Sequence, residues 1–211
     1  MKKQADNKQT TLTWDRYQRI SQVYDLMEII PERRYSSWRE RLWSLVRGPE
    51  VLEVGVGTGK NLAFYPDGVR VTGVDLASGM LERARKRAVI LNMDVTLILG
   101  DAQNLEFPDS SFDTVVATFV FCSVSDPVQG LRELGRVVRP DGQILLMEHV
   151  RSDKPLVGDL MDVLNPALVR VTGANINRRT VENIRRSGLQ IERVEDLGIG
   201  DIFKLIIARR K

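Results

Sequence analysis

Cysteine and histidine are almost absent from this chain of 211 residues, which has one of each, Cys122 and His149. A single cysteine cannot form an internal disulfide, and a single histidine leaves no cluster of ligands for a structural zinc ion. The sequence therefore predicts a cytoplasmic protein that needs no metal.

Long hydrophobic runs are also missing. The longest apolar stretches, at 115–124 and 144–147, fall well short of the ~20 residues that a membrane-spanning helix needs. The amino terminus starts with basic residues but lacks the apolar middle section of a secretion signal. We therefore expect neither a membrane span nor export. With 43% hydrophobic and 28% charged residues, the composition predicts a globular protein with a substantial core.

No strong excess of charge is present, because 31 basic and 28 acidic residues give a net charge of +3. The basic residues occur in patterns such as 82–87 and 178–186, which are typical of solvated helix faces. This distribution does not demand an anionic partner. It leaves room for peripheral contact with an anionic membrane surface, and no feature predicts an oligomeric state.

Short runs rich in Val, Ile and Leu recur from residue 51 onward and alternate with helical patterns. Five runs predict buried strands, at 51–54, 70–74, 95–99, 114–119 and 143–148. Helical spacing of apolar residues predicts helices at 78–91 and 127–138. Strands that alternate with helices predict a doubly wound, mostly parallel sheet with helices on both faces.

The end of the chain follows a different pattern. A helix is predicted at 180–187, ending at Gly188, and two strand-like runs at 189–197 and 202–209 predict an antiparallel hairpin at the sheet edge. We expect one domain of seven strands at 49–211. Residues 1–48 are expected to form a helical extension or lid, with two helices in 13–47 that meet near Pro31. Residues 152–177 are expected to cover a substrate pocket.

The most informative string is Glu53-Val-Gly55-Val-Gly57-Thr-Gly59, which follows the first predicted strand. Glycines after a strand let a ligand lie against the backbone and its N–H groups, which predicts a nucleotide-like ligand. The dinucleotide pattern G-x-G-x-x-G is not met, because Lys60 stands where that pattern has Gly or Ala. A pyrophosphate cradle is therefore disfavoured, and an ordinary tight turn remains the alternative.

Two aspartates follow the next strands. Asp75 stands about 20 residues beyond Gly55, where a carboxylate can accept hydrogen bonds from both hydroxyls of a ribose. The alternative role of Asp75 is a helix cap before Ser78. Asp101 stands at the end of the third strand and could receive an adenine amino proton, or it could be a plain turn residue.

At this point the sequence resembles the class I S-adenosylmethionine-dependent methyltransferases. The motifs that carry the resemblance are the glycine string, Val74-Asp75-Leu76 followed by Ser78-Gly-Met80-Leu81, Gly100-Asp101-Ala102, Phe112-Asp113-Thr-Val-Val, and Arg136-Val-Val-Arg139-Pro140-Asp141-Gly142. They are most similar to those of the ubiquinone/menaquinone methyltransferases and the bacterial phospholipid N-methyltransferases. The resemblance covers about residues 14–150 by motif and implies a Rossmann-like fold.

The resemblance also implies S-adenosyl-L-methionine as the cofactor, with S-adenosyl-L-homocysteine as the product. Glu53, Gly55 and Gly57 would surround the methionine portion of the cofactor. Asp75 would hold the ribose, Leu76 and Met80 would enclose the adenine, and Asp101 with the Ala102 backbone N–H would bind its edge. Tyr17 and Tyr24 would close over the cofactor, and Thr118 completes the expected cofactor-binding residues. Leu76 and Met80 could instead be plain core residues.

The sequence departs from the family after the fourth strand. Many relatives have a Leu-His-His-like segment where this chain has Phe121-Cys122-Ser123, and the menaquinone branch has an Arg-Asn pair that 118–124 lacks. Quinone C-methylation is therefore the alternative. A small-molecule or lipid-like acceptor is favoured, namely a phospholipid amine or a small thiol. A nucleic-acid methyltransferase or a non-catalytic cofactor-binding module is a further alternative.

His149 is the candidate catalytic residue, because it ends the fifth strand and has an ordinary pKa near neutrality. It would face the substrate or accept its proton. The alternative is a histidine packed under residues 152–177. Cys122 is expected to be a small buried hydrophobe rather than a nucleophile.

Overall fold

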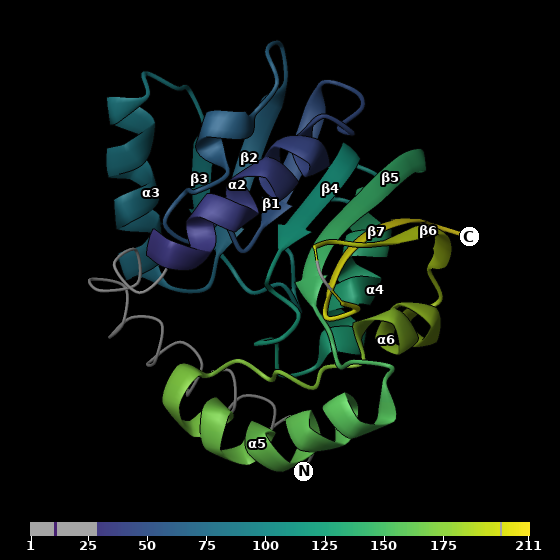
Figure 1. The fold of residues 1–211 in the computed structure, drawn as a ribbon. Coiled ribbons are helices and arrows are strands. Elements are labelled where there is room, and N and C mark those ends of the chain that lie inside the picture. Colours follow the sequence, from purple (N-terminus) through teal and green to yellow (C-terminus); the bar gives the residue numbers. More distant parts are fainter. Residues whose placement is uncertain (1–10, 12–28, 199) are drawn as a thin grey trace.

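The protein folds around a seven-stranded sheet with helices on both faces (Figure 1). The computed structural model describes residue 11, residues 29–198 and residues 200–211. Tyr17, Tyr24 and most of the first helix predicted within 13–47 lie outside the described residues. The predicted fold class, a mostly parallel Rossmann-like sheet with a C-terminal antiparallel hairpin, is confirmed.

The strands follow the order β3-β2-β1-β4-β5-β7-β6 across the sheet. Strands β1 to β5 run parallel to one another, and β7 runs antiparallel to both β5 and β6. The strands are β1 (Glu50–Val54), β2 (Arg70–Asp75), β3 (Thr96–Leu99), β4 (Phe112–Thr118), β5 (Val138–His149), β6 (Gln190–Asp196) and β7 (Phe203–Arg209). Because the first five are parallel, their carboxyl ends meet at one edge of the sheet.

Alternate residues of the central strands bury opposite faces of the sheet. Leu52 and Val115 face a core closed by α4 (Pro127–Val137) and α6 (Thr180–Ser187). Their neighbours Val51 and Val116 face a second core closed by α2 (Ile29–Trp43), which supplies two fully buried side chains, Leu42 and Trp43. Successive side chains point to opposite faces of the sheet, and both faces are covered. These strands are therefore continuous apolar runs in the sequence.

Local signals in the sequence fix several helix ends. The Asp126 carboxylate accepts a hydrogen bond from the Gln129 N–H at 2.9 Å, which caps α4, and Pro127 opens that helix. Helix α6 ends at Gly188, whose φ of 93° lies in the left-handed region. Helix α3 spans Ser78–Ile90, as expected, and a short 3₁₀ helix spans Leu62–Phe64.

Helix α2 begins at Ile29, two residues before Pro31, which a helix tolerates in its first turn because the missing N–H has no intrahelical acceptor there. Residues 12–28 lie outside the described chain, so the predicted meeting of two helices near Pro31 stays a prediction. One detail of the prediction is wrong. Strand β3 is not covered on both faces, since Ile98 and Leu99 are 38% and 56% exposed. It is an edge strand of the sheet, so it has a partner strand on only one side.

Helix α5 (Pro155–Thr172) lies beyond the carboxyl edge of the sheet rather than on either face (Figure 1). Its buried anchor is Met161, whose sulfur accepts a hydrogen bond from the Ser152 N–H at 3.4 Å. Arg151 binds two carboxylates of the helix, those of Asp159 and Asp162. Among the described helices, none combines the length and apolar character required to cross a membrane.

The packing of α4 provides a test of this architecture. We expect Leu134→Ala to lower the free energy of unfolding by about 2–5 kcal/mol, because Leu134 is fully buried and the truncation leaves a cavity. Ile90→Ala, at a side chain that is 81% exposed, should change it by less than about 0.5 kcal/mol. Urea denaturation of both variants measures the difference, and equal values would contradict the described core.

Candidate cofactor site

A cleft opens at the carboxyl edge of the parallel strands, where four of the strand ends meet. It encloses about 800 Å³, part of which is open to solvent. Its walls come from the segments that follow β1, β2, β3 and β4. They comprise Val54, Gly55, Gly57, Val74, Asp75, Leu76, Ala77, Met80, Gly100, Asp101, Ala102, Gln103, Thr118, Phe119, Val120, Ser123, Val124 and Ser125. Nine of the predicted cofactor-binding residues lie in the described part of the chain, and all except Glu53 line this cleft.

The turn after β1 requires glycine at two positions. Gly55 has a φ of 73°, and a Cβ there would lie 2.3 Å from a methyl carbon of Val120. Gly57 has a φ of 55°, with open space beside its Cα. Left-handed backbone at both positions is costly for other residues, and the missing side chains leave the backbone exposed to a ligand. The turn therefore has the form that the glycine string predicts.

Asp75 lies directly against this turn. One carboxylate oxygen accepts a hydrogen bond from the Gly57 N–H at 2.8 Å, and the other accepts one from the Ala77 N–H at 2.9 Å. Burial raises the pKa of Asp75, while these backbone N–H groups oppose the rise. The second bond reaches Ala77, the residue before the first residue of α3, and is not a helix cap, so the carboxylate joins the glycine turn to the segment before α3. It also lines the cleft, where a ribose could reach it.

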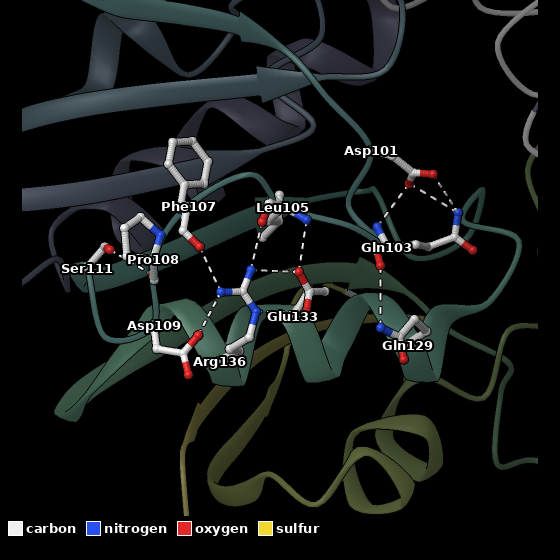
Figure 2. A network of polar contacts seen from close by, with 10 residues as sticks. All are labelled: Asp101, Gln103, Leu105, Phe107, Pro108, Asp109, Ser111, Gln129, Glu133 and Arg136. Atoms are coloured by element: carbon white, nitrogen blue, oxygen red, sulfur yellow. Dashed lines mark hydrogen bonds and ion pairs between the residues drawn. The ribbon is translucent and has the colours of Figure 1, made fainter.

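The other predicted residues close the far side of the cleft. Leu76 and Met80 lie on the wall formed by the start of α3, and Met80 is buried. Asp101 follows β3 and accepts hydrogen bonds from both the backbone N–H and the side-chain amide of Gln103 (Figure 2). Ala102 lies beside it in the cleft wall. These residues place two apolar side chains and a carboxylate on the wall of the cleft.

An arginine that the sequence analysis did not assign holds the loop that carries Asp101. Arg136 of α4 donates hydrogen bonds to the carbonyl oxygens of Leu105 and Phe107, both at 2.7 Å (Figure 2). Glu133 binds the same guanidinium and also accepts a hydrogen bond from the Leu105 N–H at 2.9 Å. The two side chains are three residues apart on one helix face, so together they fasten the loop to α4.

Glu53 lines a smaller adjoining pocket of about 340 Å³, part of which is open to solvent. Its side chain is 1% exposed and accepts hydrogen bonds from the Asn61 amide, at 2.6 Å, and from the Tyr65 hydroxyl. The Asn61 amide also donates to the Thr118 hydroxyl at 3.1 Å. Burial raises the pKa of Glu53 to about 7, and the hydrogen bonds from Tyr65 and Asn61 oppose the rise. The sequence analysis missed Asn61 and Tyr65.

A second buried carboxylate supports the cleft wall that follows β4. Glu148 is fully buried and accepts hydrogen bonds from the N–H groups of Val120 and Phe121 at 3.0 and 3.2 Å. Among the described residues, its other oxygen has no hydrogen-bond partner. Burial raises the pKa of Glu148 to about 8, so the side chain is largely protonated at neutral pH.

His149, the candidate catalytic residue, follows Glu148 but does not line either pocket. Its ring packs edge-on against Phe203 with the ring centres 5.1 Å apart, and burial lowers its pKa. Cys122 is buried and its thiol donates a hydrogen bond to the Phe119 carbonyl at 3.3 Å. Burial raises the pKa of Cys122 to about 12, which fits the expected role as a small hydrophobe.

Residues 152–177 do not line the cleft but bind the loop that forms its wall. The backbone N–H and the side-chain amide of Asn175 both donate to the Cys122 carbonyl at 2.9 Å. Arg178 donates to the Val124 carbonyl at 3.0 Å. The segment expected to cover a substrate pocket is therefore joined to the wall of the cleft.

The buried Glu148 gives a testable pH dependence. Its pKa is about 8 in the fold against an ordinary 4.5, so it stabilises the fold below pH 4.5 and loses that contribution as the pH rises through 8. Glu148→Gln should remove about 3–4 kcal/mol of this loss between pH 5 and 8, because a shift of one pKa unit corresponds to about 1.4 kcal/mol. Urea denaturation across that range measures it, with Glu82→Gln on the exposed face of α3 as the control. Parallel curves for the wild type and Glu148→Gln would contradict the assignment.

Comparison with known proteins identifies relatives of this chain. Residues 52–146 match the family described as a methyltransferase domain. The chain is 43% identical over 110 residues to the phosphatidylethanolamine N-methyltransferase of Cereibacter sphaeroides, covering 51% of this chain and 54% of that protein. It is 34% identical over 162 residues to the demethylmenaquinone methyltransferase of Staphylococcus aureus strain JH9, covering 72% and 66%. The alignments thus span about half to two thirds of these relatives.

Solved structures share the fold at lower identity. A Thermotoga maritima methyltransferase, described as a possible histamine N-methyltransferase, superposes with a TM-score of 0.72 at 24% identity and covers 94% of this chain and 100% of that one. The [4+2]-cyclase SpnF superposes with a TM-score of 0.69 at 21% identity, covering 84% and 80%. By its sequence relatives and its fold, the chain belongs to the class I S-adenosylmethionine-dependent methyltransferase family.

Proposed function

We propose that this protein transfers a methyl group from S-adenosyl-L-methionine to a small-molecule or lipid-like acceptor. The observation that carries the proposal is the Asp75 carboxylate, which lies against the Gly55–Gly57 turn inside the cleft. A carboxylate at the end of the second strand can accept hydrogen bonds from ribose hydroxyls. The glycine turn after the first strand lets the rest of the ligand lie against the backbone.

In the proposed complex, the adenosine occupies the larger cleft. Asp75 accepts hydrogen bonds from the ribose hydroxyls, and Leu76 and Met80 enclose the adenine. Asp101 and the Ala102 backbone N–H bind the adenine edge. These residues all line one continuous wall, which supports a single ligand that touches them together.

The methionine portion would then extend along Gly55 and Gly57 toward Glu53 and Thr118. The two glycines and Thr118 line both the cleft and the adjoining pocket, so a ligand can pass from one to the other. Tyr17 and Tyr24 are proposed to close over the donor, and both lie outside the described residues.

The sulfonium donor supplies an activated methyl group when it is bound. In the transfer, a lone pair of the acceptor forms the bond to the methyl carbon as the carbon–sulfur bond breaks, and the sulfur keeps that electron pair. The chain aligns the two molecules and excludes water, which can contribute about 7–11 kcal/mol in the most favourable intramolecular cases. His149 is the proposed group that faces the acceptor or takes its proton, and burial lowers its pKa.

We further propose a phospholipid amine as the acceptor, reached by peripheral contact with an anionic membrane surface from the cytoplasm. Helix α5 supports this, because a stripe of its apolar side chains lies in solvent. Leu156, Leu160 and Val163 are 88%, 57% and 76% exposed. Apolar stripes of this kind bury into the interface of a bilayer. The relative that methylates phosphatidylethanolamine supports the same acceptor, while the demethylmenaquinone relatives make a quinone the second candidate.

Asp75→Ala tests the donor site. We expect the affinity for S-adenosylmethionine to fall about 10- to 100-fold, since a hydrogen bond to a charged group contributes about 1.5–3 kcal/mol. Isothermal titration measures the affinity, and circular dichroism checks that the variant is folded. Asp67→Ala, at an exposed aspartate in the turn before β2, is the matched control and should bind normally. Unchanged affinity in Asp75→Ala, or tight binding of NAD(H) without binding of the methyl donor, would overturn the proposal.

Vesicles of phosphatidylethanolamine and phosphatidylglycerol test the acceptor. With methyl-labelled donor, we expect label in the aminophospholipid and sedimentation of the protein with the vesicles. The double change Leu160→Asp and Val163→Asp should reduce sedimentation at least about 10-fold, because charged groups resist transfer into the bilayer interface. Val89→Asp with Ile90→Asp, at apolar residues of α3 that are 80% and 81% exposed, is the control. Label confined to quinones or small thiols would contradict a phospholipid acceptor.

A further inference from the structure

We propose that Arg39 of helix α2 binds the carboxylate of the donor's amino-acid end and makes the site selective for donors that carry this group. The inference rests on the proposed function and extends it to a residue outside the recognised motifs. It follows from the composition of the pocket that adjoins the main cleft.

This adjoining pocket combines charges of both signs in a small space. Arg39 and Lys60 supply cationic groups to its lining, and Glu53 supplies a carboxylate. The amino-acid end of the donor is a zwitterion, with an ammonium group and a carboxylate on the same carbon. A pocket with a carboxylate and a cation can bind both groups at once, because each ligand charge meets an opposite charge.

The pocket is also in the right place for that end of the donor. Gly55 and Gly57 form part of its wall and part of the wall of the main cleft, and Thr118 and Phe119 do the same. A ligand whose ribose lies at Asp75 therefore needs only to follow the glycine turn to enter the pocket. Arg39 lies far from these residues in the sequence, so no local motif includes Arg39.

Arg39 is held in place rather than extended into solvent. Its side chain is 5% exposed, and its guanidinium donates a hydrogen bond to the side-chain amide oxygen of Asn61 at 2.7 Å. It also lies over the ring of Phe119, 5.9 Å from the ring centre. A guanidinium has five N–H donors in a fixed fork, so it can keep its bond to Asn61 while it donates to a carboxylate.

The same contacts link Arg39 to Glu53. Asn61 accepts from Arg39 and donates to Glu53, so one amide sits between the cation and the carboxylate. This spacing separates the two charges instead of letting them neutralise each other directly. Each can then bind the ligand group of opposite charge. Lys60 is the competing cation, but it is half-buried whereas Arg39 is 5% exposed, and its ammonium lacks the planar fork of a guanidinium.

Titrations with two donors test the assignment. S-adenosylmethionine and its decarboxylated form share the adenosine, the sulfonium and the amine, and they differ only in the carboxylate. We expect Arg39→Gln to weaken binding of S-adenosylmethionine about 10- to 100-fold and to leave binding of the decarboxylated form within about twofold. Arg39→Lys, which keeps the charge without the fork, should lose an intermediate amount.

Two variants serve as controls in the same titrations. Arg41→Gln changes an arginine on the same helix that binds Glu195 on β6, 2.9 Å away, and it should behave as the wild type does. Lys60→Gln removes the competing cation and should keep the preference for the carboxylated donor. Thermal unfolding of each variant confirms that it is folded before its affinities are compared.

Three results would overturn the inference. An equal loss of affinity for both donors in Arg39→Gln would mean that Arg39 only supports the pocket. A collapse of the preference in Lys60→Gln alone would assign the carboxylate to Lys60. An unchanged preference in Arg39→Gln would leave the proposed function standing and remove only this residue's role, whereas a wild type that binds neither donor would overturn both.

Discussion

The arrangement of the site depends on one contact, the hydrogen bond from the Gly57 N–H to the Asp75 carboxylate. It forms because β1 and β2 are adjacent parallel strands that end at the same edge, and because left-handed glycines fold the chain back toward β2. Without that turn, the ends of the two strands would not share a ligand. The cleft, the adjoining pocket and the start of α3 all meet at this point.

Three carboxyl groups gather at the same edge of the sheet, two of them buried and that of Asp75 half-buried, and their removal from water raises the pKa of each. Glu53, Asp75 and Glu148 come from three different strands or strand ends. Such groups are costly to ionise inside a protein, so the fold keeps them hydrogen bonded to N–H and O–H donors. A ligand that brings a positive charge beside Glu53 favours its ionised form. Burial makes the ionised form of Glu53 costly in the free protein, and a cationic ligand group beside it would offset that cost.

The features that could be predicted from the sequence are those that depend on short motifs. The glycine turn depends on residues within a few positions of one another, and Asp75 was predicted because it follows the next strand at a recognisable spacing from Gly55. Arg39 was missed because its partner Asn61 is 22 residues away, and Glu148 was missed because it binds a loop 27 residues earlier. An apolar run such as that of β3 indicates a strand but not its place in the sheet, so its exposure at the edge could not be predicted.

The fold alone does not determine the reaction, since a [4+2]-cyclase shares it at 21% identity. What can differ between such proteins is the part that meets the second reactant. In this chain, the loop after β4 has its N–H groups bound by Glu148 and its carbonyl groups bound by Asn175 and Arg178. Residues of this loop line the cleft, and backbone carbonyl groups of the loop accept hydrogen bonds from the segment after α5. The wall against which the donor would lie therefore depends on hydrogen bonds to residues far along the chain, which can differ between proteins that share the sheet.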